Sequence, residues 1–400
     1  MNRRELRDRR SIWPLFCLAA GLAFLTGCHF GDRGPRLIAR ADLFGSPARY
    51  QIRISPDGAQ VSYLAPSGEA MAVWVGPRHD LTAAKPLPLP AGASAEYHQW
   101  SADGRTMLVQ ESQIGTEVMH VIAIRLADGT RQDLTPMPGV RAGILGWSLD
   151  HPQDILIKIT PANARFGDIY RANIQTGALA LSEKNPGFAQ LYPDNELRLR
   201  FALSPTKAGG YEIFEHRANS WRSREIIAPE DALSFKFIDF DRSNGQIYLL
   251  DSRGRNRAAL VRVTLANGAR EVLGADDGAD IQEVQFNYFT GSVEAYRSSG
   301  DHQAWRAVDP ALKQDLTTLA KIGGEQGRYQ FVTRASDNRS WIVYIDAPQT
   351  PGSYYLYDRT TKTVTQIETR PTLAGAPLRP MHSATIKTRD GLDLVVHYTL

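Results

Sequence analysis

Short runs of alternating apolar and polar residues recur along this chain at a nearly constant interval. The clearest unit runs from Ile54 to Tyr63, where Ser55-Pro56-Asp57-Gly58 separates two apolar stretches. Proline fixes φ, aspartate bonds nearby backbone amides and glycine tolerates positive φ, so this stretch is typical of a tight turn between antiparallel strands. Corresponding positions, 44 to 49 residues apart, are Ser55, Ser101, Ser148, Tyr192, Asp241, Asn287 and Ser336. The pattern predicts seven repeats.

A second hairpin closes several of these repeats. It is a strand of alternating apolar and polar residues, followed by a turn that contains Asp, Asn or Thr. Examples are residues 121–130, 169–177, 260–268 and 355–360. Two hairpins give four strands per repeat, and a period slightly above 40 residues suits one four-stranded propeller blade. A single blade cannot bury both of its faces, so blades must stack around an axis. The predicted fold class is therefore all-β, a seven-bladed β-propeller of four-stranded blades over residues 51–370.

The segments around the repeats differ from them in composition. Residues 28–50 form a short helical or irregular lead-in to the first repeat. Residues 371–381 are rich in proline and have no apolar period, so we expect a linker there. Residues 382–400 form one more hairpin around Asp390-Gly391, which we interpret as the start of a further, truncated domain, because a lone hairpin is marginally stable in water.

The N-terminal 27 residues have the composition of an export signal. Five arginines precede an apolar run from Trp13 to Leu25, which is followed by Thr26-Gly27-Cys28. Leu-Thr-Gly-Cys resembles the cleavage box of bacterial lipoproteins, in which Cys28 would become the lipid anchor. We then expect a mature protein on the bacterial cell envelope, attached to the outer membrane and facing the periplasm. An uncleaved anchor helix with an incidental cysteine is the alternative.

The charge of the chain argues against a nucleic-acid partner. The formal net charge is +3, and the five arginines of residues 1–27 exceed the acidic residues Glu5 and Asp8 by the same amount. Once that segment is removed, no basic surplus remains to bind DNA or RNA. The chain has two cysteines, Cys17 and Cys28, and neither would remain as a free thiol in the mature lipoprotein, so no disulfide is expected.

Several motifs together resemble the N-terminal half of a prolyl oligopeptidase family serine peptidase, with the greatest similarity to its acylaminoacyl-peptidase-like branch. The resemblance extends from about residue 36 to residue 400. The motifs are Asp42-Leu43-Phe44-Gly45-Ser46-Pro47, Ile54-Ser55-Pro56-Asp57-Gly58, Asp251-Ser252-Arg253-Gly254-Arg255-Asn256 and Thr388-Arg389-Asp390-Gly391-Leu392-Asp393-Leu394.

The resemblance implies a propeller that restricts access to the active site of an α/β-hydrolase domain. In that family the catalytic Ser, Asp and His belong to the hydrolase domain, which would begin at the 382–400 hairpin, so no catalytic residue is assigned within these 400 residues. The implied partners are the absent hydrolase domain, a short peptide substrate and, through the lipid anchor, the membrane; no cofactor is implied. The alternative is a complete, non-catalytic lipoprotein propeller that binds or scaffolds partners.

One loop holds the candidate binding residues. Arg253, Arg255 and Arg257 lie together between two predicted strands, and three guanidinium groups could bind a substrate carboxylate. A solvated turn, or a contact with the absent domain, is the alternative. Four tryptophans on strand positions are expected in the core between blades: Trp74, Trp100, Trp147 and Trp341.

Two further patterns look catalytic or metal-binding but fit poorly. Residues 146–150, Gly-Trp-Ser-Leu-Asp, imitate a nucleophile elbow, yet the last glycine is absent and Ser148 falls on the repeat register. The nine histidines show no zinc-ligand spacing, so no metal site is predicted.

Overall fold

The computed structural model describes residues 37–400 apart from residues 46, 300–303 and 325–326. The chain divides into two units, residues 1–45 with 375–377, and residues 46–374 with 378–400. In the first unit the described residues include the short helix α2 (Arg40–Phe44). The proposed signal segment and Cys28 lie outside the described residues. Among those described, no helix is long and apolar enough to cross a membrane.

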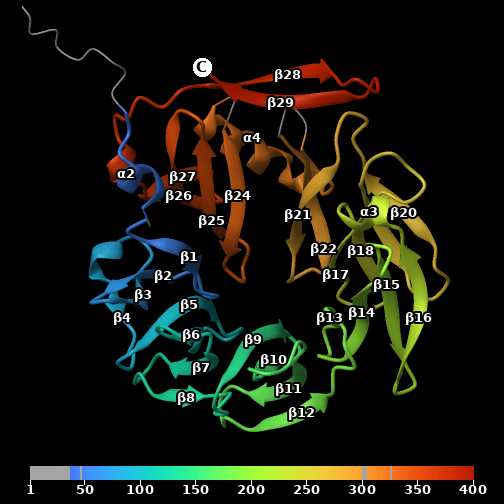
Figure 1. The fold of residues 1–400 in the computed structure, drawn as a ribbon. Helices are drawn as coiled ribbons and strands as arrows, with labels where there is room; N and C mark the ends of the chain where they lie inside the picture. Colours follow the sequence, from blue (N-terminus) through green and yellow to red (C-terminus); the bar gives the residue numbers. More distant parts are fainter. Residues whose placement is uncertain (1–36, 46, 300–303, 325–326) are drawn as a thin grey trace, which may run out of the picture. The chain divides into compact units, whose positions relative to one another are not determined.

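The second unit contains every described strand, and its sheets follow one another in chain order (Figure 1). Neighbouring strands within each sheet pair antiparallel, except for β7 and β9, which pair parallel. The first sheet comprises β1 (Tyr50–Ile54), β2 (Gln60–Ser67), β3 (Ala70–Pro77) and β4 (Lys85–Pro86), with the 3-10 turn η1 (Leu81–Ala83) before β4.

The second sheet joins two predicted repeats. Its eight strands are β5 (Ala93–Trp100), β6 (Thr106–Gln113), β7 (Met119–Arg125), β8 (Arg131–Asp133), β9 (Val140–Trp147), β10 (Asp154–Pro161), β11 (Asp168–Asn173) and β12 (Leu179–Glu183). The two groups of four are linked only through the parallel pairing of Met119 with Arg141, so each keeps its own antiparallel order.

The next two sheets hold four strands each. They are formed by β13 (Gln190–Pro193), β14 (Leu199–Pro205), β15 (Tyr211–Arg217) and β16 (Ser220–Ile227), and by β17 (Lys236–Phe240), β18 (Gln246–Asp251), β19 (Ala259–Thr264) and β20 (Arg270–Gly274). The short helix α3 (Pro229–Ala232) connects these two sheets.

The sixth repeat differs from the expected four strands. Its described residues form β21 (Ile281–Asn287), β22 (Ser292–Ser298) and β23 (Trp305–Ala307), followed by η2 (Pro310–Leu312) and helix α4 (Lys313–Gly323). The last four-stranded sheet contains β24 (Arg328–Arg334), β25 (Ser340–Ala347), β26 (Thr350–Asp358) and β27 (Thr363–Glu368), and η3 (Pro371–Leu373) follows it. The mostly β architecture is therefore confirmed, whereas the described residues do not form seven separate four-stranded sheets, and none of their sheets closes on itself.

The repeat turns form as their residue types predict. Ser55 Oγ donates to Asp57 Oδ1 at 2.5 Å, Gln60 N donates to Ser55 Oγ at 2.9 Å, and Gly58 has φ +72°. The second repeat reproduces these contacts with Ser101, Asp103 and Gly104. The hydroxyl and carboxylate satisfy backbone groups that the tight turn would otherwise leave without partners.

Hydrophobic clusters connect each repeat to the next. Consecutive clusters join the first repeat to the second and continue through to the seventh. A further cluster brings Ile52 and Val61 of the first sheet against Ile342 and Leu356 of the last. Alternate residues of one strand enter different clusters, as Trp341 and Ile342 do. Each repeat thus buries both faces of its strands against its neighbours, and the sheet of β24 to β27 packs against the first sheet (Figure 1).

Helix α4 supplies a buried acid to the core of the last two repeats. Leu316 and Leu319 pack with Trp341, and Asp315 lies fully buried beside them. Its carboxylate accepts from Tyr357 Oη at 2.5 Å and pairs with Arg359 at 2.7 Å and Lys362 at 2.5 Å. Burial alone would raise the pKa of Asp315, but the hydrogen bonds from these partners outweigh it and hold that pKa below its usual value.

Residues 381–400 form the predicted hairpin. Strands β28 (Met381–Lys387) and β29 (Asp393–Thr399) pair in continuous register around Asp390-Gly391. None of these residues, all of which the structure describes, is buried, and apolar side chains such as Ile386 and Leu394 are exposed. The hairpin contributes its backbone pairing but no core.

We expect the substitution Asp315→Ala to lower the free energy of unfolding by about 3 kcal/mol, because it leaves Arg359 and Lys362 without their buried counter-charge. Urea denaturation followed by circular dichroism would measure the change. Asp277→Ala, which removes an exposed carboxylate, is the matched control and should shift stability by less than about 0.5 kcal/mol. Equal effects of the two substitutions would show that the Asp315 cluster does not stabilise the fold.

Candidate functional site

The inner strands of six repeats surround a cavity of about 500 Å³ within the second unit. Strands β1, β5, β9, β17, β21 and β24 contribute to it, together with the turns that follow β1, β5, β9, β21 and β24 and with Trp341 of β25. Apart from β25, each is the first strand of its repeat, so the cavity lies where the repeats converge. Most of the lining is aromatic or aliphatic; its aromatic residues are Tyr97, Trp100, Trp147, Phe237, Phe286, Tyr288, Phe289, Phe331 and Trp341.

Trp147 is not the core residue that the sequence predicts. Its side chain is 39% exposed, it lines the cavity, and its ring centroid lies 5.7 Å from that of Tyr288 on the turn after β21. The ring of Tyr288 in turn contacts the ring of Phe286 edge-on, with their centroids 5.2 Å apart. The expectation was wrong because β9 is an inner strand, so a large side chain at its end covers the cavity instead of a neighbouring sheet. Trp341, by contrast, is buried as expected.

Among the described residues, three basic side chains and no acidic one line this cavity: Arg53, Lys236 and Arg334. Arg334 is neutralised by Glu294, with Nη–Oε distances of 2.7 and 3.0 Å, and its guanidinium lies 4.8 Å from the centre of the Trp341 ring. The guanidinium of Arg53 lies 4.7 Å from the centre of the Tyr97 ring. Lys236 is exposed. The cavity therefore combines aromatic surface with an excess of positive charge, which suits an anionic ligand.

A smaller cavity of about 330 Å³ shares Trp147, Phe237 and Tyr288 with the first, and Asp239 lines it. Burial raises the pKa of Asp239 to about 6, although the hydrogen bond from Phe240 N, at 2.8 Å, partly opposes the shift. Asp239 is thus a carboxyl group that changes charge close to neutral pH.

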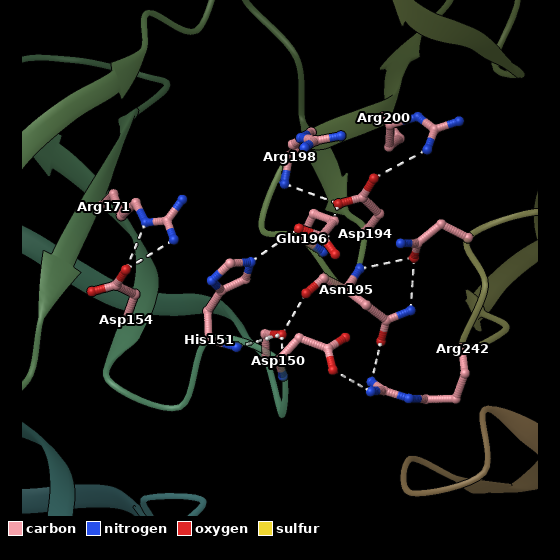
Figure 2. Close-up of polar contacts among 12 residues, drawn as sticks. Asp150, His151, Asp154, Arg171, Asp194, Asn195, Glu196, Arg198, Arg200 and Arg242 are labelled. Carbon is pink, nitrogen blue, oxygen red and sulfur yellow. Dashed lines mark hydrogen bonds and ion pairs between the residues drawn. The ribbon is translucent and has the colours of Figure 1, made fainter.

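Polar contacts between repeat turns border this smaller cavity (Figure 2). Arg242, after β17, pairs with Asp150 at 2.5 Å and donates to Asn195 Oδ1 at 3.3 Å. The backbone and side-chain nitrogens of Asn195 both donate to Asn244 Oδ1, at 3.0 and 2.7 Å. His151 Nε2 and Glu196 Oε2 form a further hydrogen bond of 3.0 Å. These bonds connect the turns of three consecutive repeats and so fix the position of the residues that line the cavity.

The three arginines proposed from the sequence lie outside both cavities. Arg253 pairs with Asp251 at 2.7 Å and Glu225 at 2.5 Å. Burial opposes the charge of Arg253, but hydrogen bonds to these carboxylates raise its pKa. Arg255 is exposed and lines a separate cavity beside α3, and Arg257 Nε donates to the backbone oxygen of Asp277 at 3.0 Å. Their role in substrate binding stays a prediction.

The serine of the elbow-like motif is part of a repeat turn. Ser148 Oγ donates to the backbone oxygen of Asn195 and accepts from the amides of Asp150 and His151. Its hydroxyl is thus used in linking two turns. Among the described residues, no group of three or more His, Cys, Asp or Glu side chains could hold a metal ion.

Sequence reasoning missed Arg53, Asp239 and the exposure of Trp147. The available signal was position: Trp100 and Trp147 each directly precede the serine of a repeat turn, at the end of an inner strand. Arg53 likewise lies two residues before Ser55. Residues just before the repeat turns are therefore the ones to examine for a role in the cavity.

Comparisons with known proteins give consistent results, although no model of a protein family matches the chain. Dipeptidyl aminopeptidase BIII of Pseudoxanthomonas mexicana is 34% identical over 370 residues, which cover 92% of this chain and 53% of that protein. Prolyl oligopeptidase B from Galerina marginata has a similar fold, with a TM-score of 0.59 and 13% identity over 87% of this chain and 54% of that one. Acylaminoacyl peptidase from Pyrococcus horikoshii gives a TM-score of 0.57 and 13% identity, covering 90% of this chain and 59% of that one. The chain spans about half the length of the curated relatives it matches.

We expect Asp239→Asn to remove a loss of stability that the native protein undergoes between about pH 4 and pH 6. Because the folded-state pKa of Asp239 is raised, its stabilising contribution is complete below the unfolded pKa near 4 and is lost as pH rises through about 6. Relative to the variant, the native protein should lose about 2 kcal/mol over this range. Denaturation of both proteins at several pH values would measure the difference. Parallel stability curves would contradict the shift, and Asp277→Asn, at an exposed position, should give such parallel curves.

Proposed function

We propose, from its place as an N-terminal propeller portion of the prolyl oligopeptidase family, that this chain controls which peptides reach the active site of a serine peptidase. The relatives that it matches are named as peptidases and are about twice as long as the matched region. The observation that carries the proposal is the aromatic cavity formed where the inner strands converge.

In this proposal the catalytic Ser, Asp and His belong to an α/β-hydrolase domain of the full-length protein. The hairpin of β28 and β29 would be its first element. Two observations support this: the hairpin contributes no buried residue, and its exposed apolar side chains need a partner to cover them. The chain described here would then be non-catalytic by itself and would act on a reaction performed in the adjoining domain.

Selection by size would follow from the dimensions of the cavity. A volume of about 500 Å³ is typical of small-ligand pockets and admits a segment of a few residues, but not a folded domain. The polar links between repeat turns border the neighbouring cavity of about 330 Å³, and they oppose separation of the third, fourth and fifth repeats (Figure 2). Short peptides are accordingly the proposed substrates, and an enclosing domain would also exclude water from the active site.

We further propose that the seven repeats act as seven blades of one propeller. The support is the sequence of clusters that joins each repeat to the next and the last sheet to the first. The shared second sheet and the three-stranded sixth repeat would be variations on this plan. Lipid attachment at Cys28, in the outer membrane and facing the periplasm, is the proposed location, supported by the Leu-Thr-Gly-Cys sequence after an apolar run.

Fluorophosphonate labelling of the native protein, in cells that produce it, tests the proposed function. The probe reacts with the activated serine of a serine hydrolase. We expect a labelled species much heavier than 44.3 kDa, because the reactive serine lies in the adjoining domain. Pre-treatment with an unreactive phosphonate analogue is the control for non-covalent retention.

An unlabelled species close to the mass of the mature chain would contradict the peptidase assignment. That result would favour a non-catalytic lipoprotein propeller, which binds its ligands without hydrolysing them.

A further inference from the structure

Four buried polar atoms lack a hydrogen-bond partner in the described part of the chain, and all four lie on strands β1 and β5. They are Gln51 Oε1, Arg53 Nε, His98 Nδ1 and Trp100 Nε1. The two strands are in contact, since Gln51 Nε2 donates to the backbone oxygen of Glu96 at 3.1 Å. Unsatisfied buried polar groups are uncommon and destabilising, so their concentration at one place calls for an explanation.

Arg53 is the charged member of this group. Among the described residues it forms no ion pair, and its guanidinium packs on the Tyr97 ring. The other cations of the cavity differ from it, since Arg334 is paired with Glu294 and Lys236 is exposed at the edge. None of the described residues that line the cavity is a carboxylate, so they provide no counter-charge to Arg53.

The neighbouring histidine does not alter this balance. His98 is fully buried and contacts Ser62 Oγ at 2.9 Å. Burial, together with the charge of Arg53, holds the pKa of His98 well below its usual value, so the imidazole is neutral. Arg53 is therefore the charge that a ligand would meet in this part of the cavity.

The backbone of β1 is distorted where it positions Arg53. Gln51 has φ +52°, in the left-handed region that residues other than glycine seldom occupy, and the register with β2 shifts between Tyr50 and Arg53. Irregularities of this kind redirect side chains and are concentrated near functional sites. The hydrogen bond from Gln51 N to Tyr354 Oη, at 3.2 Å, ties this distortion to the last sheet.

We propose that the cavity binds a carboxylate of a peptide, with Arg53 as its ion-pair partner and the aromatic lining packed against an adjacent apolar side chain. Arginine binds carboxylates through two parallel hydrogen bonds, and Trp100 and Trp147 supply apolar surface in the same cavity. The inference rests on the proposed function only in taking a peptide as the occupant. The carboxylate comes from an acidic side chain or from the C-terminus of the peptide.

Tryptophan fluorescence titration of the 400-residue chain tests the proposal, since Trp100, Trp147 and Trp341 line the cavity. The first pair of probes is acetyl-Phe-Glu-amide and its neutral isostere acetyl-Phe-Gln-amide. We expect the acidic peptide to bind about tenfold to a hundredfold more tightly. A second pair, acetyl-Phe-Phe with a free or an amidated C-terminus, shows whether a terminal carboxylate is bound in the same way.

The variant Arg53→Gln should abolish the preference for the acidic peptide, because it removes the unpaired charge. Arg222→Gln, which removes an exposed arginine of the outer strand β16, is the matched control and should leave the preference unchanged. Circular dichroism and the melting temperature establish that each variant is folded. If Arg53→Gln does not fold, the proposal is tested by the affinities of the native chain for the acidic and the neutral peptide.

Equal affinity of the native chain for the charged and the neutral peptide in both pairs, or no binding of any of the four peptides, would overturn the proposal. So would a folded Arg53→Gln variant that retains the preference. These outcomes are independent of the labelling result. A labelled protein without carboxylate preference leaves the peptidase assignment intact, whereas a carboxylate preference in an unlabelled protein makes the chain a peptide-binding module.

Discussion

The structure depends on the need of each small sheet to bury two apolar faces. The second strand of a repeat carries apolar side chains in succession, and alternate residues enter the clusters on its two sides. In β10, Ile155 and Ile157 pack toward the second repeat while Leu156 packs toward the fourth. A four-stranded sheet with two such faces is not stable alone, so its neighbours complete its core. The same requirement brings the first and last sheets together.

The cavity follows from this packing. Second and third strands lie between two neighbouring sheets, whereas the ends of first strands meet where the repeats converge and have no further sheet to cover them. A large side chain at such an end, Trp147, therefore lines a space instead of filling a core. The turns that follow these strands connect to one another through Arg242 and Asn195, so the residues that close each hairpin also hold its cavity-lining neighbours in place.

The sequence predicts those features that depend on local chemistry. The Ser-Pro-Asp-Gly turns were predictable because Ser55, Asp57 and Gly58 act within six residues of one another. Helix α4 interrupts the repeat pattern, and only the spacing of Leu312, Leu316 and Leu319 indicates it. Trp147 contacts Tyr288, 141 residues further along the chain, and no local pattern carries that information. The sequence therefore indicates how each repeat folds, but not what meets at the centre.

The arginines illustrate the same limit and show what the structure adds. Sequence reasoning selected Arg253 because three arginines cluster in one loop, yet Glu225 and Asp251 already compensate its charge. Nε, Nη1 and Nη2 of Arg253 already donate to these two carboxylates, so few donors remain for a ligand. Arg53 is isolated in sequence and stands out only when its surroundings are known, since it lines an acid-free cavity on a distorted strand. Availability for binding thus depends on the absence of internal partners, which is a property of the folded chain.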